Sequence, residues 1–193
     1  MIDKEILEVI YEYYPKKCKY STIEYQNSRE FKKYIQKIKY NSEYMNVYKE
    51  LKHIFKQYYI KIWSANDEPG KHISVLFHKN HDILDDDVEL IKKLGGKRLN
   101  LEIYISKLVK VYYIYMQETI YKDGKWSFFN YDYNYYMEDS LKKKLNKTMQ
   151  YLGYKELLKN DVNSIVWDIE TECHYTNEVK VFHCLFSDLE NNI

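Results

Sequence analysis

The chain has 193 residues, of which 45% are hydrophobic and 31% are charged, and its formal net charge is +1. This composition is typical of a globular protein, and the presence of only 5 glycines and 2 prolines argues against flexible linkers and low-complexity disorder. The near-neutral balance also differs from the strongly basic balance of a dedicated nucleic-acid-binding domain. We therefore expect one domain over residues 1–193, with 23 tyrosines as its most unusual feature.

The cysteines and the N-terminal residues indicate a reducing compartment. An odd and small set of cysteines (Cys18, Cys173 and Cys184) does not build a disulfide framework. The first residues are acidic and lack the basic and then apolar pattern of a secretory signal. The longest apolar run, Val111–Met116, is much shorter than the roughly 20 residues that a membrane helix needs. We expect a cytoplasmic protein without membrane contact.

The first part of the chain, residues 1–57, is predicted to be mainly helical. Apolar residues recur at helical spacing over residues 2–14, and Pro15 ends the run. The stretches 28–39 and 42–57 continue in the same style, with lysines and glutamates on the face opposite the apolar stripe.

The remainder, residues 58–193, is predicted to be a sheet with two interrupting helices. Alternating apolar residues and β-branched or aromatic runs indicate strands at 58–63, 73–77, 99–121, 126–129, 165–173 and 179–186. Helical spacing ended by glycine indicates helices at 86–94 and 137–152. Asp123-Gly124 is a strong hairpin signal. This order predicts an α+β fold in which N-terminal helices precede a largely antiparallel sheet, with helices packed on one face.

An aromatic segment follows the predicted hairpin. Trp126 stands in the returning strand, and Tyr131, Tyr133, Tyr135 and Tyr136 come soon after it. If the strand continues, the odd-numbered tyrosines project from one face. Tyrosine and tryptophan are enriched at interface hot spots, so we predict that these residues bind a protein partner. The alternative is that the rings cover the sheet or pack under the following helix.

The C-terminal part of the chain is acidic. Residues 161–193 contain one lysine against seven aspartates and glutamates, a net charge of −6. On a strand over 165–173, Asp168, Glu170 and Glu172 share one face and repel each other unless cations compensate. Those cations come either from lysines of the same chain or from a basic partner, and we predict that these residues bind a basic partner.

The acidic group around residue 86 and the nearby histidines are the candidates for enzymatic chemistry. Asp82, Asp85–Asp87 and Glu89 stand at a predicted helix start, where N-capping is the simpler interpretation than cation binding. His72 and His78 are about 20 Å apart on an extended strand, too far to bind one ion. A hydrolase using Asp85–Asp87 or the histidines near His78 stays as an alternative function.

A mirrored pair of dipeptides, Cys173-His174 and His183-Cys184, has the residue types of a zinc site. Adjacent residues on a strand point to opposite faces, and the usual Cys-x-x-Cys spacing is absent. We therefore expect no metal and no cofactor, with buried free thiols instead.

A run of lysines, Lys142–Lys147, lies on the predicted outer face of the 137–152 helix. Lysines interleaved with aromatic residues are typical of single-strand binding, so a nucleic-acid-binding accessory protein is a further alternative. A solvated helix face explains the same lysines, and we do not expect nucleic acid to be the partner.

The segment Lys125–Phe129, followed by a helix that ends at Gly153-Tyr154, resembles the immunity proteins of bacterial polymorphic toxin systems in type. These are small, aromatic-rich α+β chains without catalytic motifs that carry an acidic patch. The resemblance implies a stoichiometric inhibitor that binds a cognate protein toxin and blocks its active site. An acidic surface then mimics the nucleic acid that a basic nuclease toxin binds.

Overall fold

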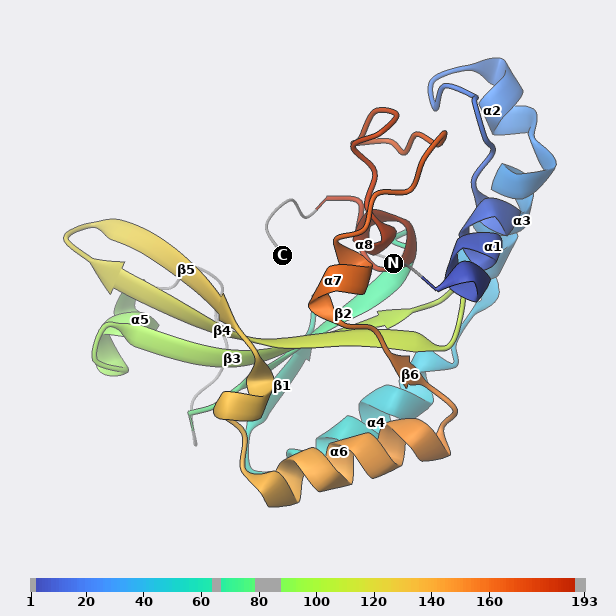
Figure 1. Ribbon diagram of the computed structural model, residues 1–193. Helices are drawn as coiled ribbons and strands as arrows, with labels where there is room; N and C mark the ends of the chain where they lie inside the picture. Colours follow the sequence, from blue (N-terminus) through green and yellow to red (C-terminus); the bar gives the residue numbers. More distant parts are fainter. Residues whose placement is uncertain (1–2, 64–66, 79–87, 190–193) are drawn as a thin grey trace.

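The computed structural model describes residues 3–63, 67–78 and 88–189 (Figure 1). Four helices come first: α1 (Lys4–Tyr13), α2 (Ile23–Asn27), α3 (Arg29–Tyr40) and α4 (Tyr44–Ile54). The central elements are β1 (Tyr59–Ile62), β2 (Gly70–Leu76), α5 (Val88–Lys93), β3 (Lys97–Ser106), β4 (Val111–Lys122) and β5 (Lys125–Tyr131). The 3-10 turn η1 (Tyr133–Tyr135) precedes α6 (Asp139–Tyr151), β6 (Lys155–Glu156), α7 (Lys159–Val162) and α8 (Val181–Leu185).

The N-terminal helices begin where short polar side chains cap them. The Asp3 carboxylate accepts the Glu5 N–H of α1, and the Ser28 hydroxyl accepts the Phe31 N–H of α3. Pro15 follows two residues after the end of α1, because proline has no backbone N–H to donate and cannot continue a helix. The predicted helices are confirmed. Helix α2 was not predicted, because five residues are too few to show a helical spacing of apolar side chains. No helix in the described ranges is long and apolar enough to cross a membrane.

The sheet follows the chain order. Neighbouring strands pair antiparallel in the order β1-β2-β3-β4-β5, and β6 adds a short parallel pairing to β4. The β4–β5 turn has Asp123 and Gly124 at φ of 51° and 76°, so the predicted Asp-Gly hairpin is confirmed. Since sequential strands lie side by side, local turns alone determine most of the topology.

Helices cover both faces of the sheet, which corrects the expectation of one covered face. Ile103 and Ile114 pack toward α4 and α6, and Tyr104 and Tyr113 pack toward α1 and α8 on the other side (Figure 1). Both of these cross-strand pairs are buried, so β3 and β4 are apolar on each face. Strands buried on both sides need a covering layer on each. The α+β class and the antiparallel sheet are confirmed.

The last two predicted strands are wrong. Between 165 and 186, a single bridge joins Ile165 to Lys180, and the residues between them form turns. The segment predicted as the strand 179–186 contains the helix α8, whose side chains are all buried. A short apolar run without polar alternation fits a buried strand and a buried helix equally well, so periodicity cannot separate them.

Candidate functional site

The β4–β5 hairpin projects from one end of the molecule (Figure 1). Its outer part pairs β4 from Met116 to Lys122 with β5 from Lys125 to Tyr131. Helices α4 and α6 pack lower on the sheet, so the hairpin side chains receive little cover. Long strand pairing holds this exposed arm rigid, which suits a surface that must keep its shape.

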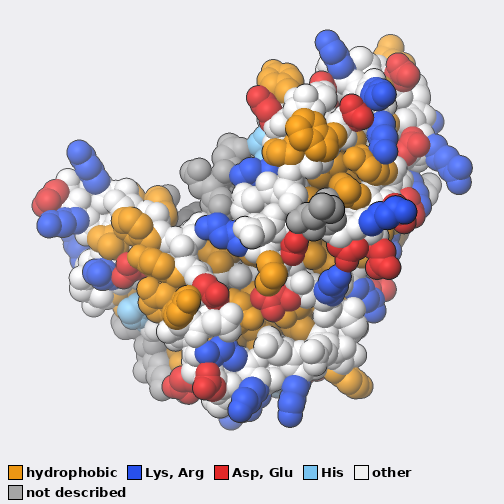
Figure 2. Space-filling model, in the orientation of Figure 1, with side chains coloured by type: hydrophobic (Ala, Val, Ile, Leu, Met, Phe, Trp, Pro, Cys, Tyr) orange, Lys and Arg blue, Asp and Glu red, His pale blue; other side chains and the backbone are white. Residues whose placement is uncertain are grey.

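Exposed and half-buried aromatic side chains gather on this arm and on the turn after it. We call them the hairpin surface: Trp126, Phe128, Phe129, Tyr131, Tyr135 and Tyr136. Phe128 is 54% exposed and Phe129 45% exposed, on opposite faces of β5. Hydrophobic side chains over this region are visible in Figure 2. Single exposed hydrophobic residues are normal on a protein surface. Two exposed phenylalanines on one short strand instead form a hydrophobic patch.

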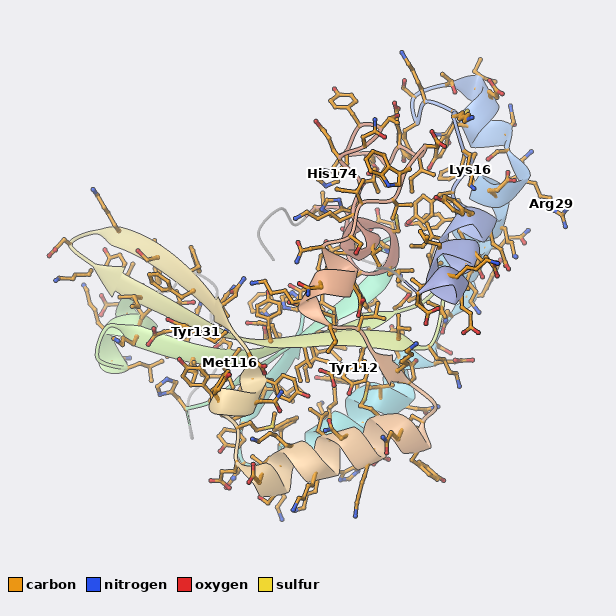
Figure 3. All side chains as sticks on the ribbon, in the orientation of Figure 1. Lys16, Arg29, Tyr112, Met116, Tyr131 and His174 are labelled. Atoms are coloured by element: carbon orange, nitrogen blue, oxygen red, sulfur yellow. The ribbon has the colours of Figure 1, made fainter. Side chains whose placement is uncertain are left out.

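Ring contacts fix part of the hairpin surface. Trp126 packs on Tyr121 with ring centroids 4.7 Å apart, and Tyr131 packs on Tyr136 at 5.2 Å. Figure 3 shows Tyr131 and Met116 at the base of the hairpin, where β4 and β5 pair. Pre-positioned rings lose little freedom when they bind, which favours affinity.

Tyr133 does not lie on this surface, which corrects the prediction that it shares a strand face with Tyr131 and Tyr135. The strand ends at Tyr131, and η1 turns Tyr133 inward, where it is only 4% exposed. Its hydroxyl donates to Glu156 Oε2 at 3.2 Å, beside the Tyr112 hydroxyl at 3.1 Å. Burial raises the pKa of the Glu156 carboxyl, although both hydroxyls act to lower it. The predicted common face of the tyrosines therefore fails because the strand stops.

A cavity that the sequence did not predict lies beside the hairpin. β5 pairs with β4 from Met116 onward, whereas β6 pairs with Val111 and Tyr112 along the same edge. The gap between the two strands is a cavity of about 230 Å³, lined by Tyr113, Tyr115, Asn130, Tyr131, Tyr133 and Glu156 among others. It extends the aromatic character of the hairpin surface inward.

The acidic residues predicted to share a strand face do not do so, because the strand is absent. Asp168 has φ of 64° in a turn, and its side chain is exposed. Glu170 accepts the Tyr20 N–H at 3.2 Å, and Glu172 accepts the Tyr20 hydroxyl at 3.3 Å. The loops that hold these acids lie well away from the hairpin (Figure 1). The predicted residues thus form two separate surfaces.

The histidines and buried carboxylates form structural pairs. His72 Nε2 lies 2.7 Å from Glu102 Oε2, and Ser74 donates to the same oxygen. Burial by itself raises the pKa of the Glu102 carboxyl, but the charge of His72 and the hydrogen bonds lower it overall. Ser74 is bound to the carboxylate and not to the imidazole, which differs from a hydrolase triad.

The mirrored pairs bring their histidines together but not their cysteines. His174, labelled in Figure 3, and His183 stack with ring planes at 2° and centroids 3.6 Å apart. Cys184 is buried, whereas Cys173 is exposed. Within the ranges that the structure describes, no group of three potential ligands is arranged to hold a metal ion.

Two further groups of residues were the candidates for a hydrolase site and for nucleic-acid binding. Asp82, His81 and Asp85–Asp87 lie outside the described residues, and Glu89 pairs with Lys92 at 3.4 Å. On α6, Lys143, Lys144 and Lys147 are exposed, while Lys142 pairs with Asp139 at 2.8 Å.

Comparisons with family models, with curated proteins and with solved structures find no match to this chain.

Proposed function

We propose that this protein is a stoichiometric binding protein of the immunity type, which neutralises a cognate bacterial toxin domain by protein–protein contact in the cytoplasm. The observation that carries the proposal is the hairpin surface, where Phe128, Phe129, Tyr135 and Tyr136 are each at least 45% exposed. Exposing this much aromatic area costs free energy in water, and a bound partner recovers it.

The composition of the surface fits a hot spot. Tyrosine and tryptophan anchor most strongly when neighbouring residues exclude water around them. Trp126 and Tyr131 are half-buried and held by adjacent rings, whereas Phe129 and Tyr136 stand further out. Such a set supplies rigid anchors surrounded by accessible apolar area.

The toxin as partner follows from the resemblance in type, and the three free cysteines agree with a reducing compartment. A toxin inhibitor needs tight, stoichiometric binding and no chemistry of its own. An interface of ordinary size takes about 800 Å² from each partner. The hairpin surface together with the adjoining cavity lies on one continuous part of the molecule.

The test is quantitative capture of partners from the host lysate with three tagged chains. These are the wild type, the double variant Phe129→Ala/Tyr136→Ala, and the control Tyr151→Ala, which removes an aromatic ring that is 89% exposed on α6. We expect one stoichiometric partner with the wild type and the control, and loss of it with the double variant. Expression of that partner alone should arrest growth, and co-expression with this chain should restore it.

Two results contradict the proposal. A captured partner that does not arrest growth excludes toxin neutralisation. Equal capture by the double variant excludes the hairpin surface as the contact, provided that its unfolding midpoint matches the wild type.

A further inference from the structure

A second groove lies far from the hairpin surface. It has a volume of about 400 Å³ and runs between α2 and α3 on one side and the loops 67–69, 171–173 and 188–189 on the other. This volume is within the range of about 300–1,000 Å³ typical of ligand pockets. Its lining consists of aromatic rings and carboxylates, together with a few apolar and small polar residues.

The aromatic wall is a continuous chain of rings. Tyr20 and Tyr25 lie 4.9 Å apart by ring centroids, Tyr25 and Phe31 lie 5.2 Å apart, and Phe31 stacks on Tyr34 at 5.9 Å. The Tyr25 hydroxyl donates to the Glu170 carbonyl at 3.1 Å, which ties this wall to the opposite loop. Tyr25 is fully buried, whereas Tyr20, Phe31 and Tyr34 are half-buried, and the electron-rich faces of half-buried rings attract cations.

Carboxylates lie opposite this wall. Asp67, Glu68, Glu172 and Asp188 all line the groove, and no lysine or arginine is among its described lining residues. Among these four carboxylates, Asp188 forms an ion pair in the described part of the chain, with His174 at 3.8 Å. The described residues of the groove wall therefore bring four carboxylates together without a lysine or arginine among them.

Two buried lysines also act on this charge. Lys71 and Lys107 interact electrostatically with Asp67 and Glu68, but neither lines the groove. Burial and the neighbouring Lys71 lower the pKa of Lys107 to about 8, and burial lowers the pKa of Lys71. Glu68 is only 8% exposed, and burial raises the pKa of its carboxyl, with Asp188 adding to the increase.

A metal ion does not fit these observations. No three carboxylate, thiol or imidazole groups converge to hold one in the part of the chain that the structure describes. Hard cations need several oxygen ligands at one point. The elongated wall of rings suits a planar organic cation instead.

We propose that this groove binds an arginine side chain presented by a basic protein partner. A guanidinium group stacks on tyrosine faces and donates to two carboxylate oxygens at once, which a compact ammonium group cannot do. Glu172 is exposed and Glu68 is 8% exposed, both line the groove, and these two carboxylates are the proposed acceptors for the guanidinium. The site is separate from the hairpin surface, and its ligand chemistry does not depend on the partner proposed above.

The experiment is an NMR titration of the full chain with the peptide acetyl-Gly-Gly-Arg-Gly-Gly-amide at low salt. The control peptide has citrulline in place of arginine and so has the same shape without the charge. We expect saturable shifts at the amides of Tyr20, Cys173 and Asp188, and binding about tenfold weaker for the citrulline peptide. Added salt should weaken the binding of the arginine peptide.

Matched variants locate the site. Glu68→Gln and Glu172→Gln each remove one charge from the groove and keep the side-chain shape, so both should weaken arginine-peptide binding severalfold. Glu178→Gln removes an exposed charge from the same loops but outside the groove and should leave binding unchanged. Because Glu172 is exposed, its variant tests the proposal even if Glu68→Gln does not fold.

Three results overturn the proposal: no saturable shift, equal binding of the citrulline peptide, or equal weakening by Glu178→Gln. None of them bears on the hairpin surface, whose failure is detected by partner capture instead.

Discussion

The Tyr133 hydroxyl donates a hydrogen bond to Glu156 Oε2 at 3.2 Å and thereby ties the turn after β5 to β6. Glu156 also accepts from Tyr112, so one carboxylate joins three elements. β5 ends at Tyr131, two residues before this contact. The contact divides the aromatic segment into a buried anchor, Tyr133, and the exposed rings on either side of it.

Tyr133→Phe should lower stability without weakening partner binding. Loss of one buried hydrogen bond costs about 0.5–1.5 kcal/mol in the free energy of unfolding. Urea denaturation measures this loss, and Tyr135→Phe, which alters a ring that is 85% exposed, should change stability very little. Equal stability of the two variants would show that the Glu156 contact contributes nothing.

Single substitutions on β5 should distinguish its two faces. Phe129 and Tyr131 lie on the same face of β5, and the Tyr131 ring packs on the Tyr136 ring. These three rings therefore form one contiguous area. We expect Phe129→Ala to weaken partner binding by about 2 kcal/mol, as hot-spot truncations do. Phe128→Ala on the other face should cost less than half of that. Calorimetric titration with the captured partner measures both, and the reverse order would place the contact on the face of Trp126.

The buried Lys107 should make stability depend on pH. Its pKa of about 8 in the folded state lies below the ordinary value of 10.5. Between these two values the unfolded chain holds a proton that the folded chain has lost, so the contribution of Lys107 to stability rises with pH across this window.

Lys107→Met removes this titration. The variant should gain most over the wild type below pH 8, and the gain should shrink as the pH approaches 10.5. Ionising tyrosines and thiols are common to both chains and cancel in the difference. Lys144→Met, at an exposed position on α6, should show no such trend. A gain that stays constant with pH would mean that Lys107 is charged in the folded state throughout this range.

Gly70 allows β2 to approach the end of α8. A Cβ atom at this position would lie 2.7 Å from both the Cα and the carbonyl oxygen of Phe186. The Phe186 N–H is bound to the Phe182 carbonyl at 2.9 Å, so this backbone does not move easily. Gly70→Ala should therefore destabilise the fold by about 1–3 kcal/mol. The midpoint of urea unfolding measures this, with the exposed Ser127→Ala as control, and an unchanged midpoint would contradict the contact.

Elements with local signals were predictable from the sequence. Asp3 and Ser28 cap their helices within three residues, and Asp123-Gly124 forms its turn from its own backbone preference. Trp126 and the tyrosines after β5 were predicted to bind a partner because tyrosine and tryptophan are enriched at interface hot spots, and that contact stays a prediction. Only part of this candidate site was predictable. Tyr133 leaves the strand direction and donates to Glu156, which lies 23 residues further along the chain and gives no local signal.

Contacts between distant residues decided the rest. Glu170 and Glu172 accept hydrogen bonds from Tyr20 across 150 and 152 residues of sequence, and Tyr25 donates to the Glu170 carbonyl across 145. The groove formed there has no local pattern, because its lining comes from three parts of the chain that are far apart in sequence. For the same reason, no periodicity in 165–173 predicts that these residues form turns.

The amino-acid order by itself determined the α+β class, the positions of the main helices and the antiparallel order of the central strands. These features depend on capping, turn chemistry and periodicity, which act over a few residues. Only the tertiary structure decided that α8 is a helix, that both sheet faces are covered and that the acids meet a wall of tyrosines. Those outcomes depend on which distant side chains share the same buried space, and packing selects among conformations that local preference leaves nearly equal in free energy.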